Sequence, residues 1–86
     1  MTAVKVQILP ISGLVPFVSA LATLMKLKTV YIRREIWKTD TLISIKKVPS
    51  FSDPLLIIKS PKGTMPWLPN QTEIFAKDWV VMKAYK

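Results

Sequence analysis

Two of the three tryptophans lie near polar or basic residues that could bind a ligand. Trp37 closely follows the pair Arg33-Arg34, and Trp67 precedes the polar run Asn70-Gln71-Thr72. An indole face stacks on a nucleobase with about 1 to 3 kcal/mol per base, and amide or hydroxyl groups hydrogen-bond base edges or ribose. Trp79 lies in an apolar run and is expected in the core. For any single tryptophan the ordinary alternative is packing with one hydrogen bond from the indole N–H.

The residue types available for catalysis are few. The 86 residues contain no His, no Cys and only five Asp and Glu. Nucleophilic triads, zinc hydrolysis and di-metal chemistry depend on these residue types. The composition therefore favours a binding protein over an enzyme, and we expect neither a metal nor another cofactor.

The charge balance indicates an anionic partner. Thirteen Lys and Arg against five Asp and Glu give a formal net charge of +8, while half of the residues are hydrophobic. A globular domain with this field attracts nucleic acid, anionic lipid or a phosphorylated small ligand, and the charge alone does not choose among them. The cations are scattered, and only Arg33-Arg34 and Lys46-Lys47 are adjacent, which disfavours a nucleic-acid-binding arm. So small a domain buries a limited share of its surface, which favours oligomers.

Arg34 is the cation whose surroundings the sequence constrains most. The segment Thr29–Trp37 is rich in β-branched and aromatic residues and contains no Gly or Pro, which predicts a strand. Alternate residues of a strand share a face, so Arg34 would lie beside Val30 and Ile32 among apolar neighbours. Because an unpaired buried guanidinium is costly, we expect Arg34 to bind a phosphate, to pair with Asp or Glu, or to reach solvent at the sheet edge.

The segment Val6–Met25 contains no charge and has about the length of a membrane-spanning helix or a secretory signal. Its polar residues, Gly and two Pro argue against both alternatives. The same residues instead predict a strand at Val4–Leu9, a turn at Pro10–Gly13 and a helix at Leu14–Lys26 capped by Ser12. One face of this helix is apolar and is expected to pack on the core: Leu14, Phe17, Val18, Leu21, Leu24 and Met25.

The rest of the chain predicts a small antiparallel sheet. The turn Pro61-Lys62-Gly63 joins two strands into a hairpin, whose second strand cannot be central because it holds Pro66. Asn70 and Glu73 have the spacing of a capping box and predict a short helical turn. The expected strands are Thr41–Val48, Leu55–Lys59, Thr64–Leu68 and Trp79–Met82. The predicted class is α+β: a single ligand-binding domain, residues 1–86, with one N-terminal helix packed on this sheet, and an N-terminal extension, residues 1–12, whose role the sequence does not indicate.

The segment Leu55–Met82 resembles the C-terminal half of a small phage-encoded family, the second family of Thoeris anti-defence proteins. The matching residues are Gly63, Pro66-Trp67-Leu68, Gln71-Thr72-Glu73 and Asp78-Trp79. Upstream, the helix with Ser19-Ala20-Leu21 and the basic strand ending in Trp37 also match, so the resemblance covers about residues 14–82.

The resemblance implies a function. Members of that family are homo-oligomers, reported as tetramers, that sequester cyclic nucleotide immune messengers without cleaving them; the messenger is a cyclic ADP-ribose isomer or, in some relatives, a cyclic dinucleotide. This chain would then be a phage protein acting in the cytoplasm of the infected bacterial host. The resemblance places Trp37 and Trp67 as stacking walls and Asp78 and Trp79 as structural residues. It further implies that Arg34 binds phosphate, with Arg33 and Lys38 as weaker phosphate candidates, and that base or ribose is contacted by Asn70, Gln71 and Thr72.

Two other functions remain open at this level. The main alternative is a small basic nucleic-acid-binding protein that uses the same cations and aromatic residues. A membrane-associated protein built on Val6–Met25 is the further alternative. The sequence also departs from the family pattern beside the expected pocket, where Lys38-Thr39-Asp40 lacks a glycine and Pro69 replaces a small residue.

Overall fold

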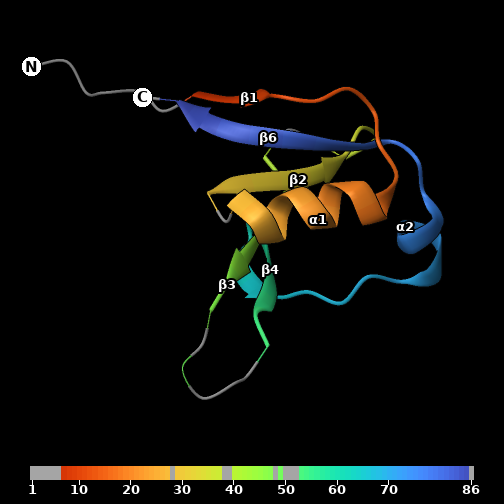
Figure 1. The fold of residues 1–86 in the computed structure, drawn as a ribbon. Coiled ribbons are helices and arrows are strands. Elements are labelled where there is room, and N and C mark those ends of the chain that lie inside the picture. Colours follow the sequence, from red (N-terminus) through yellow and green to blue (C-terminus); the bar gives the residue numbers. More distant parts are fainter. Residues whose placement is uncertain (1–6, 28, 38–39, 48, 50–52, 86) are drawn as a thin grey trace, which may run out of the picture.

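The computed structural model describes residues 7–27, 29–37, 40–47, 49 and 53–85, which form a six-stranded antiparallel sheet and two helices (Figure 1). The strand order is β1-β6-β2-β3-β4-β5, which confirms the predicted α+β class with one main helix on an antiparallel sheet. In chain order the elements are β1 (Gln7–Pro10), α1 (Phe17–Leu27), β2 (Val30–Arg34), β3 (Leu42–Lys46), β4 (Leu55–Ser60), β5 (Gly63–Pro66), α2 (Gln71–Phe75) and β6 (Trp79–Tyr85).

The last strand of the chain, β6, lies between β1 and β2. Its first residue, Trp79, pairs with Arg34 at the end of β2. It continues to Tyr85, beyond the predicted end at Met82, because β1 pairs with its second half. The strand predicted at Val4–Leu9 is confirmed over its described part, and β1 gives this N-terminal extension the role of an edge strand.

The hairpin of β4 and β5 forms the opposite edge and confirms the predicted turn. Gly63 has a φ of 126°, which an L side chain rarely adopts. Pro66 pairs with Ile57 at the outer side of the sheet, where the missing N–H of proline interrupts no second ladder.

Strand β2 ends earlier than the residue pattern of Thr29–Trp37 predicted. The backbone N–H of Trp37 donates to the carbonyl of Arg34 at 3.0 Å and closes a turn after β2. The predicted strand Thr29–Trp37 therefore shortens to Val30–Arg34. The turn brings Trp37 back towards the helix side of the sheet, where it packs against the core.

Helix α1 begins at Phe17 and not at the predicted Leu14. Val15 instead forms an isolated bridge with Trp79, in which both backbone N–H groups donate, at 2.8 and 3.0 Å. This pairing keeps Val15 extended. The first turn of the helix then forms when Ala20 donates to the carbonyl of Pro16 at 3.1 Å.

The prediction that Ser12 caps this helix is wrong. Its hydroxyl accepts a hydrogen bond from the N–H of Val81 at 3.0 Å and donates to the carbonyl of Gly13 at 2.8 Å. Ser12 therefore bonds the segment before α1 to strand β6, 69 residues away in the sequence.

The main core lies between α1 and the sheet. On the helix, Phe17, Ala20 and Leu24 are buried, while Val18 is 72% exposed. The predicted apolar stripe was too wide, because the sheet covers only the Phe17–Leu24 side and leaves Leu14 and Met25 exposed as well. The sheet contributes Val30, Ile32, Ile43, Trp79 and Val81 to this core.

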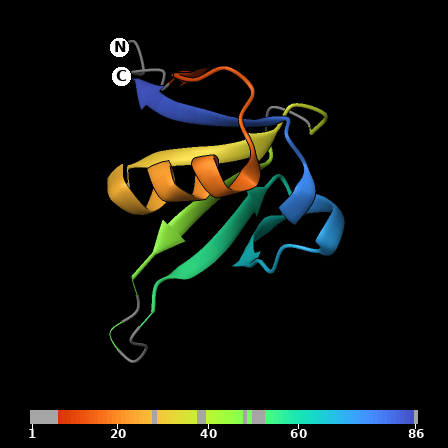
Figure 2. The ribbon, with the colours of Figure 1, turned by 45° about the vertical axis from the view of Figure 1, so that its right-hand side comes forward.

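The other face of the sheet carries no helix within the described residues (Figures 1 and 2). A smaller buried cluster of Leu42, Val80 and Met82 lies there, with Tyr31 packed against it. The sheet is strongly twisted, so that β3 and β4 run steeply across the direction of β1 and β6 (Figure 2). We call the face of the sheet opposite α1 the open face.

The described part of Val6–Met25 consists of a strand, a connection and most of α1, in place of one continuous helix. Helix α1 has 11 residues, and none of the helices in the described ranges is long and apolar enough to cross a bilayer.

Candidate functional site

Four aromatic rings meet where α1 begins, and we call them the aromatic cluster: Phe17, Trp37, Trp67 and Trp79. The centroid of Trp79 lies 5.1 Å from Phe17, 5.2 Å from Trp37 and 6.0 Å from Trp67. Trp37 and Trp67 lie 6.2 Å apart, and Phe17 and Trp67 lie 6.3 Å apart. The fold thus brings together the two tryptophans that the sequence assigned to the site, from the turn after β2 and the segment after β5.

Trp79 is the buried centre of the aromatic cluster. Its side chain is 0% exposed, and its indole N–H donates to the carbonyl of Glu73 in α2 at 2.9 Å. The expectation that Trp79 belongs to the core is confirmed. Because it contacts the other three rings, it sets their positions relative to one another.

Trp37 and Trp67 are half-buried and pack against the core with part of their surface in solvent. Neither indole N–H has a hydrogen-bond partner among the described residues. Neither nitrogen is a buried donor without a partner, so both can bond to water or to a ligand. The two indoles therefore offer a ligand flat apolar surface together with two available hydrogen-bond donors.

The half-buried indoles of Trp37 and Trp67 are not parallel and cannot hold a base between them. Their planes meet at 83°, edge to face, with centroids 6.2 Å apart. A base held between two parallel rings needs them about 7 Å apart, twice the usual contact distance. A base can therefore stack on the outer face of Trp37 or Trp67, but the second wall of such a pocket has to come from elsewhere.

Arg34 has an internal partner. Its Nε donates to one carboxylate oxygen of Asp78 at 2.9 Å and its Nη2 to the other at 3.3 Å. The N–H of Glu35 also donates to the backbone carbonyl of Asp78, at 2.8 Å. Of the partners expected for Arg34, the structure thus provides the acidic residue, and a phosphate would have to compete with Asp78. The pair ties the turn that carries Trp37 to the start of β6.

Arg33 is 9% exposed and lies on the opposite face of β2 from the aromatic cluster. Its Nη1 donates to the carbonyls of Arg34 and Trp37 at 3.1 Å each and to that of Glu35 at 3.5 Å. Its Nε is buried without a partner among the described residues. These bonds hold the backbone of the turn after β2 from the open face of the sheet. Arg33 therefore positions Trp37 through the backbone of that turn.

The polar run after Trp67 begins a helix. The side-chain oxygen of Asn70 accepts from the N–H of Glu73, and the Glu73 carboxylate accepts from the N–H of Asn70, both at 2.8 Å. This capping box was predicted and is confirmed. Gln71 and Thr72 are exposed in the first turn of α2. Lys38 lies outside the described residues.

The site is suited to binding. Two acidic residues that bond to the segments around the aromatic cluster, Glu73 and Asp78, are engaged in the capping box and the ion pair. In the ranges that the structure describes, no three acidic side chains lie close enough together to hold a metal ion. Phe17 completes the aromatic cluster and was not predicted there, although its place on the apolar helix stripe was a signal.

Comparison with known families gives one match over most of the chain. A family model described as the Thoeris anti-defense 2-like domain matches residues 15–82, which include the whole aromatic cluster. No match to the sequence was found among curated proteins.

Proposed function

Because the chain belongs to the Thoeris anti-defense 2-like family, we propose that it counters a bacterial defence by binding a cyclic nucleotide messenger and withholding it uncleaved. The messenger is a cyclic ADP-ribose isomer or a cyclic dinucleotide, and the protein is phage-encoded and acts in the cytoplasm of the host. The observation that carries the proposal is the pair Trp37 and Trp67, which are distant in sequence, adjacent in space and partly open to solvent.

Sequestration without cleavage agrees with the chemistry of the chain. It contains neither His nor Cys, so the commonest general base and the thiolate nucleophile are lacking. The indole N–H groups, which have no partner among the described residues, can donate to a ligand at the ring edges, and Gln71 and Thr72 are exposed for base or ribose contacts. The side-chain oxygen of Asn70 caps α2, and its amide NH₂ remains as a donor for a ligand.

We further propose a homo-oligomer, a tetramer as in the family, whose pockets are completed between subunits. The edge-to-face indoles supply one stacking wall, and a second subunit supplies the other. Apolar residues on the helix side are available for such an interface: Val18 and Phe75 are each 72% exposed, and Met25 is 49% exposed. Surface of this kind is characteristic of protein interfaces.

The first experiment is a thermal-shift and calorimetric screen of cyclic ADP-ribose isomers and cyclic dinucleotides. A ligand at about 100 times its dissociation constant stabilises the native state by about 2.7 kcal/mol. Trp67→Ala should then weaken binding by about 5- to 150-fold, the equivalent of about 1 to 3 kcal/mol of stacking. Mass spectrometry should recover the ligand intact.

Two controls make the screen decisive. Lys62→Ala changes an exposed residue of the β4–β5 turn and should leave affinity unchanged. If Trp67→Ala fails to fold by circular dichroism, Trp67→Phe retains a flat ring and tests stacking alone. Wild-type affinity in a folded Trp67→Ala protein, or no ligand in the panel that raises the melting temperature, would overturn the proposal.

The net charge of +8 supports nucleic-acid binding as the second candidate. In that case affinity for an oligonucleotide falls steeply with salt, because phosphate contacts release counterions. It would also exceed the affinity for every small cyclic ligand.

A further inference from the structure

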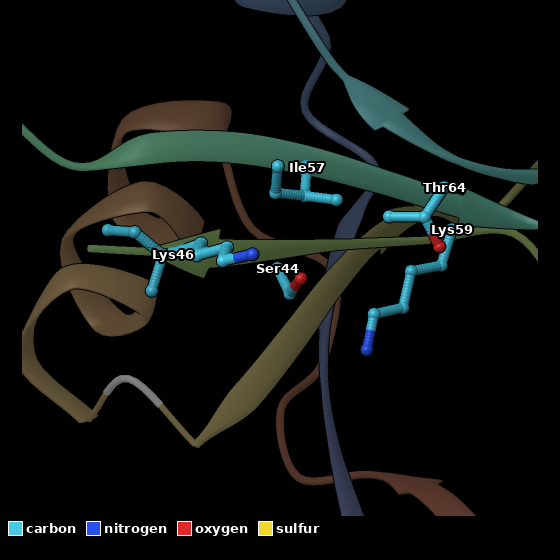
Figure 3. A pocket seen from close by; sticks show the side chains of 6 residues that line it. Ser44, Lys46, Ile57, Lys59 and Thr64 are labelled. Carbon is cyan, nitrogen blue, oxygen red and sulfur yellow. The ribbon is translucent and has the colours of Figure 1, made fainter. Parts of the chain in front are cut away.

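The open face of the sheet carries a pocket of about 300 Å³ that the aromatic cluster does not share (Figure 3). Three neighbouring strands, β3, β4 and β5, line it. Its lining consists of two lysines, two hydroxyl residues and two isoleucines: Ser44, Ile45, Lys46, Ile57, Lys59 and Thr64.

The alternation of the strands puts the polar residues on this face. On β3, Ile43 and Ile45 pack on the helix-side core, so Ser44 and Lys46 point the other way. On β4, Leu56 and Ile58 belong to the helix side, so Ile57 and Lys59 face the pocket.

Cross-strand pairing then brings these residues together. Ser44 pairs with Ile57, and Lys59 pairs with Thr64. In Figure 3 the nitrogen of Lys46 is directed along β3 towards Ser44. The pocket therefore has an apolar floor at Ile57 with hydroxyl and ammonium groups around it.

Among the residues that the structure describes, no carboxylate neutralises the two lysines. Lys59 lies over the ring of Tyr31, with its Nζ 5.5 Å from the centroid, and crosses β3 to reach it. This contact holds the ammonium over the open face. Within the described ranges neither Lys46 nor Lys59 pairs with a carboxylate, and the hydroxyls of Ser44 and Thr64 have no hydrogen-bond partner.

We propose that this pocket binds the oxyanion of a phosphorylated small molecule, at a site separate from the indoles. Two ammonium groups and two hydroxyls provide charge-assisted and neutral hydrogen bonds to phosphate oxygens. The volume is at the lower end of small-ligand pockets, enough for a phosphate with an attached sugar or base. A nucleic-acid strand needs a groove that follows several phosphates, and this pocket is a single hollow on three strands.

The proposal goes beyond the proposed function. Trp67 packs on the core of the helix side, and Lys46 and Lys59 face the opposite side of the sheet. One small ligand cannot contact both sites within one chain. The two sites are therefore expected to respond to different substitutions.

The test is an NMR titration of the ¹⁵N-labelled protein with inorganic phosphate, adenosine monophosphate and adenosine. Phosphate and the monophosphate should shift the amides of Ser44, Lys46 and Lys59 saturably, and adenosine should not. A lower dissociation constant for the monophosphate than for phosphate places the rest of the ligand inside the pocket. Equal curves for both indicate a free-phosphate site, which also supports the proposed oxyanion site.

The double variant Lys46→Met/Lys59→Met should weaken binding by at least about tenfold, because it removes both charged donors. The matched control is Lys26→Met/Lys77→Met, which removes the same net charge at exposed positions outside the pocket. It should change the affinity less than about twofold. If the double pocket variant does not fold, Lys46→Met alone and Ser44→Ala provide the same comparison.

Three outcomes would overturn the proposal. Equal losses in the pocket variant and its control would assign binding to the overall field of the protein. Saturable shifts at the indole N–H groups in place of the pocket amides would assign it to the aromatic cluster. Tight binding of a single-stranded oligonucleotide, with no saturation by the monophosphate, would make the open face a nucleic-acid surface. Trp67→Ala should leave phosphate binding unchanged, so this site can fail or hold independently of the messenger site.

Discussion

The ion pair between Arg34 and Asp78 should make a measurable contribution to stability, which a double-mutant cycle can isolate. The two N–H donors lie 2.9 and 3.3 Å from the two carboxylate oxygens, and the side chains are 15% and 24% exposed. Exposed pairs contribute about 0 to 1 kcal/mol, whereas breaking a buried pair costs about 3 to 5 kcal/mol. For this intermediate burial we expect Asp78→Ala to cost about 1 to 3 kcal/mol and the coupling energy to be about 1 to 2 kcal/mol.

The assay is urea unfolding of the wild type, Arg34→Met, Asp78→Ala and the double variant, followed by circular dichroism. The backbone bond from Glu35 to the carbonyl of Asp78 is retained in all four proteins, so the cycle reports the side chains. Each kcal/mol should lower the melting temperature by about 4 to 8 °C in a domain of this size. The single variants should also weaken messenger binding, because the pair ties the turn of Trp37 to β6.

A coupling energy below about 0.3 kcal/mol, within the usual error of additivity, would refute this reasoning. The pair would then be a solvated contact, and the turn would be held by the three carbonyl bonds of Arg33.

Three further substitutions test local features of the fold by urea unfolding. Asn70→Ala removes the cap of α2 and should cost about 1 kcal/mol, while Asn70→Asp keeps the acceptor and should cost less; equal losses would contradict the capping role. Gly63→Ala meets no neighbour within 4 Å, so any cost, about 1 to 3 kcal/mol, comes from its φ of 126°; an unchanged midpoint would contradict that strain. Trp79→Phe removes the indole hydrogen bond to the carbonyl of Glu73 and reduces core volume, and should cost about 2 to 4 kcal/mol; a loss below about 0.5 kcal/mol would show that the cluster does not depend on it.

Features governed by neighbouring residues were predictable. The capping box of Asn70 and Glu73 depends on a three-residue spacing, and the hairpin turn depends on the positive φ that Gly63 allows. The succession of strands and helices along the chain also followed from composition and alternation, since β-branched runs and prolines act locally. The residues at which the elements begin and end could not be predicted from the sequence, because hydrogen bonds to distant strands determine them. Val15 bonds to Trp79, and this contact delays the start of α1.

The candidate site shows the same division. Residue types alone indicated that Trp37 and Trp67 could stack on a base and that Arg34 needed an anionic partner. Tertiary structure selected Asp78, 44 residues away, as that partner, and turned the two indoles edge to face around a buried third ring. It also assembled the basic pocket of Lys46 and Lys59 from separate strands. The sequence determines the chemistry of each residue and the spacing of near neighbours. The partner of Arg34 and the angle between the rings of Trp37 and Trp67 depend on how distant segments pack.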